Sequence, residues 1–168
     1  DIKDLKKSKV KCAKNKLNKI NPNTLIKIYN FRLNKKKAEK LIKQYDFIVD
    51  GSDNFKTKFL INDLSLKFKK FLTVGAINKF DGHIFTYDFI NNKTPCLRCF
   101  FQEDKISDDI LNCEYEGVLG TVAGIVGTLQ ANEVLKQILN IGKNLNGQIL
   151  ILDLLNLNFR KAKIKKQK

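Results

Sequence analysis

The segment DFIVDGSDN, residues 46–54, is the most informative stretch of this chain. Its apolar run at residues 47–50 predicts a short buried strand, and Gly51 with Ser52 predicts a turn. Asp53 and Asn54 then predict the start of a helix. A strand that runs into a helix in this way is typical of an α/β sheet, in which ligands bind at the carboxyl ends of the strands.

The start of that helix has two interpretations that this segment leaves open. The unpaired N–H groups of a helix N-terminus favour a phosphate, and a carboxylate such as Asp53 can hold a metal ion that bridges phosphates. The alternative is that Asp53 only caps the helix, which is a common structural role.

The rest of the chain continues the alternation of helices and strands. Apolar spacing predicts helices at residues 6–19, 34–44, 54–69 and about 118–139, and strands at residues 24–29, 71–77, 79–89, 148–153 and 158–165, with an irregular stretch at 91–116. The order predicts an α/β fold with a Rossmann-like, doubly wound parallel sheet and a C-terminal antiparallel β extension. No G-x-G-x-x-G turn occurs, so either the chain binds no nucleotide or that turn precedes residue 1, which leaves the fold incomplete at its N-terminus.

Length and composition indicate one globular domain. The chain has 168 residues, of which 43% are hydrophobic, and this is enough to bury a core. No apolar run reaches the roughly 18 residues that span a bilayer, and no signal peptide or internal repeat is found. The chain has no Met and begins with Asp1, so we expect it to be a piece of a longer or processed protein.

The formal net charge of +15 raises the question of nucleic-acid binding. Only Arg32, Arg98 and Arg160 are arginines, and the other basic residues are lysines accompanied by many Asn and Ile residues. A/T-rich codons encode Lys, Asn and Ile, and base readers favour arginine. We therefore expect a solvated lysine surface that can attract an acidic protein partner.

Four cysteines occur, Cys12, Cys96, Cys99 and Cys113, and the lack of a secretory signal indicates a reducing compartment. Cys96 and Cys99 form a C-x-x-C knuckle that supplies two of the four ligands of a structural zinc site. The alternative is a pair of thiols without metal. Cys113 precedes a helix start, which lowers a thiol pKa, but nearby carboxylates oppose that effect.

Glycines recur along residues 117–127, ahead of and within the last predicted helix. Small residues on one helix face allow a neighbouring backbone to approach closely. In a membrane this pattern favours helix dimers, and here we expect close packing within a soluble core.

Taken together, these segments resemble the ThiF/MoeB/HesA family of adenylating enzymes, which are similar to ubiquitin-activating enzymes. The resemblance covers nearly the whole chain. It rests on this series of motifs in order: Ser8-Lys9-Val10 with Ile20-Asn21-Pro22, Asp50-Gly51-Ser52-Asp53-Asn54, Val74-Gly75-Ala76, Phe80-Asp81-Gly82, Pro95-Cys96-Leu97-Arg98-Cys99, residues 113–120, and Gly127-Thr128-Leu129-Gln130-Ala131.

The resemblance implies an adenylyltransferase that uses ATP and Mg²⁺ to activate the C-terminal glycine of a ubiquitin-like sulfur carrier, in molybdopterin or thiamin biosynthesis. Lys9 matches the lysine that contacts the ATP phosphates, and Asp53 matches the aspartate that binds ATP–Mg²⁺, with Asn54 supporting the same site. Cys96 and Cys99 match the first half of the family's Zn²⁺ site. Cys113 matches a cysteine that links covalently to the carrier in some members.

Two family features are missing from residues 1–168: the Gly-rich nucleotide-binding unit at the N-terminus and the second C-x-x-C at the C-terminus. We therefore expect one truncated ThiF/MoeB-like domain. The resemblance also implies a homodimer in the cytoplasm, with no nucleic-acid or membrane partner. Two alternatives stay open: a non-catalytic fragment that docks a carrier, and a basic nucleic-acid-binding module with a zinc knuckle.

Overall fold

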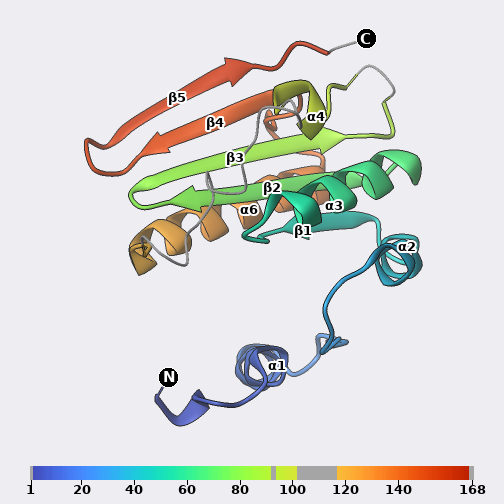
Figure 1. The fold of residues 1–168 in the computed structure, drawn as a ribbon, viewed down its shortest axis with the longest axis vertical. Coiled ribbons are helices and arrows are strands. Elements are labelled where there is room, and N and C mark those ends of the chain that lie inside the picture. Colours follow the sequence, from blue (N-terminus) through green and yellow to red (C-terminus); the bar gives the residue numbers. More distant parts are fainter. Residues whose placement is uncertain (1, 92–93, 102–116, 167–168) are drawn as a thin grey trace. The chain divides into compact units, whose positions relative to one another are not determined.

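The computed structural model describes residues 2–91, 94–101 and 117–166, and the chain divides into two compact units, residues 1–34 and 35–168 (Figure 1). The first unit contains a short 3-10 helix, Ile2–Asp4, and helix α1, Lys9–Ile20. Within this unit the Lys16 ammonium pairs with the Asp4 carboxylate at 2.9 Å. The first predicted helix is therefore confirmed, with a later start.

The strand predicted at residues 24–29 is wrong. Residues 25–30 have no regular secondary structure, and none of the strand pairings among the described residues includes them. A strand exists only where a neighbouring backbone pairs with its N–H and C=O groups. Apolar alternation identifies a segment that can pair, but it does not supply the partner.

A five-stranded sheet, in the order β1-β2-β3-β4-β5, forms the centre of the second unit. Along the chain this unit contains α2 (Lys35–Ile42), β1 (Phe47–Asp50), α3 (Phe55–Lys67), β2 (Phe71–Asn78), β3 (Asp81–Asp88), α4 (Leu97–Phe100), α6 (Gly120–Leu139), β4 (Gln148–Asp153) and β5 (Asn158–Lys163). The α/β class and the antiparallel extension are thus confirmed.

Only β1 and β2 are parallel among the described strands, with Asp50 opposite Val74. The other three pairs of neighbours are antiparallel. The change of direction follows from the tight hairpin in which Asn78 pairs with Asp81, because two residues are enough to join antiparallel strands but not parallel ones. Lys79 takes the positive φ of 45° that this turn needs.

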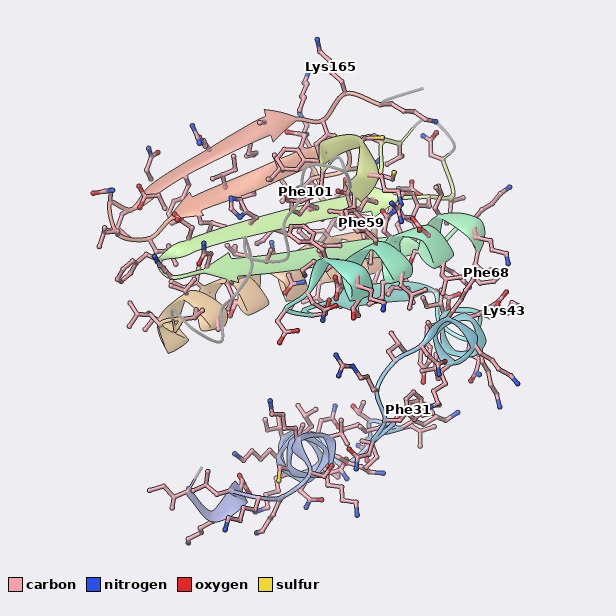
Figure 2. All side chains as sticks on the ribbon, viewed as in Figure 1. Phe31, Lys43, Phe59, Phe68, Phe101 and Lys165 are labelled. Carbon is pink, nitrogen blue, oxygen red and sulfur yellow. The ribbon has the colours of Figure 1, made fainter. Side chains whose placement is uncertain are left out.

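Helix α2 packs against α3 at one edge of this unit (Figure 2). Ala38 and Ile42 of α2 are buried. The Lys43 ammonium lies 4.9 Å from the centre of the Phe68 ring, close enough for a cation–π contact. The apolar face of the second predicted helix is therefore buried against α3.

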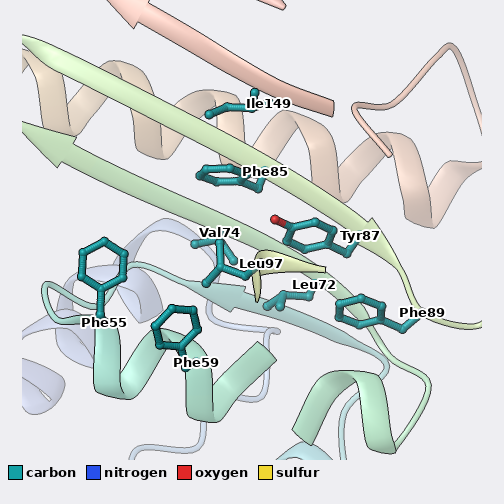
Figure 3. Packing of buried hydrophobic residues seen from close by; sticks show 9 residues of the cluster. All are labelled: Phe55, Phe59, Leu72, Val74, Phe85, Tyr87, Phe89, Leu97 and Ile149. Carbon is teal, nitrogen blue, oxygen red and sulfur yellow. The ribbon is translucent and has the colours of Figure 1, made fainter. Parts of the chain in front are cut away.

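Helices pack on both faces of the central strands, and alternate residues of β2 and β3 point to opposite faces. On one face α3 and α4 contribute to a cluster rich in aromatic rings (Figure 3): Phe55, Phe59, Leu72, Val74, Phe85, Tyr87, Phe89, Leu97 and Ile149. Burial of such rings removes a large apolar area from water and stabilises the fold.

The other face is covered by α6. Ile84 and Leu152 of the sheet pack there with Val122, Val126 and Leu145. The helix comes very close to the sheet at Gly82, where an added Cβ would lie 2.4 Å from Cγ2 of Val126. The absence of a side chain at Gly82 therefore allows α6 to pack closely against β3.

Replacing Gly82 with Ala is expected to lower the free energy of unfolding by about 1–3 kcal/mol, because it overpacks a closed contact. Urea unfolding followed by circular dichroism measures the change. Adding Val126→Ala should restore part of the loss, since it removes the opposing methyl group. Gly124→Ala is the matched control: its Cβ would meet no atom within 4 Å, so a loss there equal to that of Gly82→Ala would contradict the overpacking argument.

The glycines of α6 do not serve the close packing predicted for them. An added Cβ at Gly120, Gly124 or Gly127 would meet no atom of the described residues within 4 Å. The buried face of α6 carries Val122 and Val126 instead, and the spacing of the glycines does not reveal which face of the helix is buried.

Among the described residues, no helix is long and apolar enough to cross a membrane.

Candidate functional site at the carboxyl ends of the parallel strands

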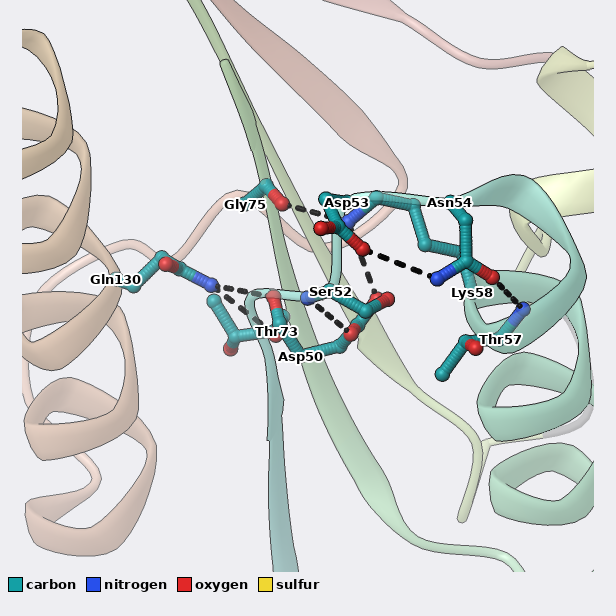
Figure 4. A network of polar contacts seen from close by, with 9 residues as sticks. All are labelled: Asp50, Ser52, Asp53, Asn54, Thr57, Lys58, Thr73, Gly75 and Gln130. Carbon is teal, nitrogen blue, oxygen red and sulfur yellow. Dashed lines mark hydrogen bonds and ion pairs between the residues drawn. The ribbon is translucent and has the colours of Figure 1, made fainter. Parts of the chain in front are cut away.

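The loop between β1 and α3 starts at Asp50, whose side chain is 1% exposed. Its Oδ1 accepts a hydrogen bond from the Ser52 N–H at 2.8 Å (Figure 4). This contact is an Asx-type turn, in which the aspartate replaces a backbone carbonyl and bends the chain. It sets the path of the loop just before Asp53.

Asn54, and not Asp53, is the N-cap of α3. Its Oδ1 accepts a hydrogen bond from the Thr57 N–H at 2.8 Å, and its backbone is extended, with φ −137° and ψ 144°. The alternative that Asp53 caps the helix is therefore wrong. The Asn54 amide nitrogen donates instead to Oδ1 of Asp53 at 3.1 Å, so the capping residue also orients the carboxylate beside it.

A cavity of about 270 Å³ opens beside this loop. It is lined by the loop itself, by the start of α3, by the end of β2 and by α6: Gly51, Ser52, Asp53, Lys58, Gly75, Ala76, Ile77, Ala123, Val126, Gly127 and Gln130. Ser52 Oγ is buried and has no hydrogen-bond partner among the described residues. A buried hydroxyl normally finds a partner, so the cavity has room and chemistry for a polar ligand.

Lys58 supplies a buried cation at this cavity, and sequence reasoning missed it. Its side chain is 2% exposed, and Nζ lies 3.3 Å from Oδ2 of Asp50. Nζ also donates to the carbonyl oxygen of Gly75 at 2.7 Å. The available signal was weak: Lys58 follows Asn54 by one helical turn, but many lysines in this chain have that spacing from a polar residue.

Gln130 of α6 was also missed as a site residue. Its Nε2 donates to the Asp50 carbonyl oxygen at 3.0 Å and lies 3.5 Å from the Thr73 carbonyl oxygen. The side chain occupies the space above Gly75, where an added Cβ would lie 2.4 Å from Gln130 Oε1. A glutamine 80 residues away along the chain thus holds the ends of β1 and β2 together.

The two cysteines of the C-x-x-C knuckle lie together at the start of α4. Their sulfurs are 3.8 Å apart, and the Cys96 N–H donates to Cys99 Sγ at 3.4 Å. Burial raises the pKa of the Cys96 thiol, which disfavours the thiolate that zinc binds. Among the described residues there is no group of three or more His, Cys, Asp or Glu side chains that could hold a metal.

Helix α4 is held on the middle of α3. The Leu97 N–H donates to Oδ1 of the fully buried Asn62 at 2.9 Å. Arg98 binds both carboxylate oxygens of Asp63, each at 2.8 Å, and its guanidinium lies over the Phe59 ring at 4.6 Å. The knuckle is therefore fixed to the same helix that Asn54 caps.

A smaller cavity of about 100 Å³ lies against the aromatic cluster and is lined by Lys58, His83, Leu97 and Phe101 among others. Burial lowers the pKa of His83, an effect that Asp81 opposes and Arg160 reinforces. The imidazole is therefore held toward its neutral form, which suits its place beside apolar rings.

Two further predicted site residues remain, Lys9 and Cys113. Lys9 is the first residue of α1 and belongs to the first unit, so its role stays a prediction. Cys113 lies outside the described residues. Asp53 lines the cavity, and Asn54 donates to its carboxylate from the start of α3; their roles in binding stay predictions.

The fold and this cavity define an α/β protein with a cavity at the carboxyl ends of its parallel strands, the place where ligands bind in such folds. The ThiF family model matches residues 1–168, and the chain belongs to the ThiF family, as the series of motifs predicted.

Relatives over 30% identical match nearly the whole chain. The sulfur carrier protein adenylyltransferase of Thermus thermophilus is 36% identical over 166 residues, which make up 97% of this chain and 61% of that protein. A probable molybdopterin-synthase adenylyltransferase of Pyropia yezoensis is 38% identical over 162 residues, 96% of this chain and 42% of that protein. The chain therefore spans less than two thirds of these relatives.

Solved structures with the same fold include Escherichia coli MccB with ATP, at a TM-score of 0.81. That match covers 99% of this chain and 50% of MccB, at 15% identity. PaaA matches at a TM-score of 0.74 with 17% identity. At these identities the likeness concerns the fold alone.

Proposed function

We propose that this chain is part of an adenylyltransferase that activates the C-terminal glycine of a ubiquitin-like sulfur-carrier protein. In this reaction a carboxylate oxygen of the glycine forms a bond to the α-phosphorus of ATP. The bond from that phosphorus to the oxygen bridging it to the β-phosphate breaks, and pyrophosphate leaves. The product is a carrier adenylate that is ready to accept sulfur.

The observation that carries this proposal is the Asp53 carboxylate at the cavity, oriented by Asn54 at the end of a parallel strand. Both the attacking carboxylate and the triphosphate are anions. Their approach needs positive charge and oriented dipoles at the point of reaction. A carboxylate that holds a cation, beside the N–H groups of a helix start, meets that need.

Ser52 and Asp53, on the loop side of the cavity, fit a Mg²⁺–phosphate group. Asp53 would hold the ion, and the buried, unpartnered Ser52 hydroxyl offers a further polar contact. Bound there, Mg²⁺ would neutralise charge on the phosphates. The cavity of about 270 Å³ is smaller than the roughly 300–1,000 Å³ of whole small-molecule sites. It therefore fits the phosphate end of ATP, and other parts of the protein would hold the rest.

Other parts of the proposal rest on the family resemblance. Lys9 would contact the ATP phosphates, and Cys113 would link to the carrier in a later step. Zinc does not fit the described residues, because Cys96 and Cys99 lie together without a third His, Cys, Asp or Glu side chain that could complete a metal site. We also propose a homodimer, a cytoplasmic location, and a role in molybdopterin or thiamin biosynthesis.

The test is ATP–pyrophosphate exchange with MgATP and several sulfur-carrier proteins that end in Gly-Gly. We expect exchange that requires the carrier and is lost when its terminal glycine is removed. Exchange that ignores the carrier tail would contradict the proposal. A folded protein that binds the carrier without any exchange would favour a docking role, and salt-sensitive binding to RNA or DNA without ATP dependence would favour the nucleic-acid alternative.

A further inference from the structure

Lys58 is a buried charge that the proposed reaction does not use directly. The residue is buried and is the fourth residue of α3. An ammonium group loses hydration when it is buried, so such lysines are kept only where partners compensate. Here the partners are the Asp50 carboxylate and the Gly75 carbonyl oxygen. They are also the residues at the carboxyl ends of the two parallel strands.

Asp50 is the point at which these contacts meet. Its Oδ2 pairs with Lys58, its Oδ1 accepts from the Ser52 N–H, and its carbonyl oxygen accepts from Gln130 Nε2. Figure 4 shows that these contacts come from three sides, namely the loop, α3 and α6. The end of β1 is thereby fixed immediately before the loop that carries Asp53.

The same ammonium reaches across to the second strand. Through Gly75 it ties α3 to the end of β2, and Gln130 packs against Gly75 from the opposite direction. The loop of residues 51–53 therefore runs between two ends that these contacts hold, Asp50 and the start of α3. We expect this to limit the positions that the Asp53 carboxylate can take.

We propose that Lys58 is a positioning residue for Asp53 in the adenylation reaction, acting through Asp50 and Gly75 rather than on the substrate. This inference rests on the proposed function. By holding the ends of β1 and β2, Lys58 determines the position of the Asp53 carboxylate relative to β2. It thereby determines where a magnesium–phosphate group can bind.

The test compares Lys58→Met, Lys58→Arg and the neutral pair Asp50→Asn with Lys58→Met. Asn and Met are both neutral, so this pair leaves no unpaired buried charge, and Asn can still accept the hydrogen bond from the Ser52 N–H. We therefore expect the double variant to fold. Lys67→Met is the matched control, since Lys67 ends the same helix and its side chain is 60% exposed. Two readouts are used: carrier-dependent exchange with MgATP, and the magnesium-dependent rise of Tm caused by ATP.

We expect Lys58→Met and the neutral pair to lower exchange by about 10²-fold, the loss typical of a misplaced reacting group. Lys58→Arg should recover most of it, and Lys67→Met should leave it unchanged. Adding Lys58→Met to Asp53→Ala should cause no further loss, since the two act on one step. Wild-type exchange in the neutral pair, or losses that multiply, would overturn the proposal.

Failure of the proposed function shows a different pattern. A wild-type protein without exchange, whose Tm still rises with MgATP, contradicts adenylation alone. The positioning role is then decided by the second readout, in which the neutral pair must lose the magnesium-dependent part of the rise. A neutral pair that keeps it overturns the role of Lys58. A wild-type protein with neither exchange nor a MgATP effect overturns both.

Discussion

Replacing Asp53 with alanine is expected to lower carrier-dependent ATP–pyrophosphate exchange by about 10³-fold, the upper range for removal of one electrostatic group from a reaction site. The carboxylate lies at the cavity and is oriented by the Asn54 amide. Its loss leaves the proposed site without its ligand for a cation. Exchange is measured as incorporation of labelled pyrophosphate into ATP, at saturating MgATP and carrier.

The same variant should unfold at the same urea concentration as the wild type, because Asp53 is exposed and Asn54 caps the helix. Asp46→Ala is the matched control. Its side chain is 90% exposed at the opposite end of β1, and we expect its exchange rate to equal that of the wild type. Retained exchange in Asp53→Ala, or an equal loss in Asp46→Ala, would remove Asp53 from the proposed site.

The second large effect concerns stability. Lys58→Met is expected to lower the free energy of unfolding by about 3–5 kcal/mol, because it leaves the buried Asp50 carboxylate without its cation. Both side chains are almost fully buried, at 2% and 1% exposure, so solvent screens their interaction little. This loss is a large share of the roughly 5–15 kcal/mol by which domains are stable.

Urea unfolding of Lys58→Met, of Asp50→Asn, and of the two combined measures this coupling. The combined variant should be more stable than Lys58→Met alone, since a neutral pair replaces an isolated charge. The exposed Lys67→Met should change stability little. Additive losses in the combined variant would show that Asp50 and Lys58 do not act as a pair.

Local pattern predicted much of this architecture. The strand Phe47–Asp50 and the helix that starts after Asn54 were predicted from one segment, because apolar runs and capping residues act over a few neighbouring positions. The antiparallel C-terminal strands were predicted in the same way. The segment at residues 24–29 failed because pairing is not a local property.

The roles within the candidate site were only partly predictable. The sequence predicted that Asp53 and Asn54 follow the buried strand, but it left open whether Asp53 binds a ligand or only caps the helix. The structure decides for Asn54 through its bond to the Thr57 N–H. Asp53 does not cap the helix, and its side chain lines the cavity.

The family, the order of helices and strands in the second unit apart from α4 and the pairing, and the position of Asp53 and Asn54 after a strand end were all predictable from the sequence. The contacts of Lys58 and Gln130 with that strand end, the short helix α4, and the open space beside the glycines of α6 were not. Helix and turn signals act over three or four residues, whereas a buried ion pair or amide bond depends on elements that only folding brings together.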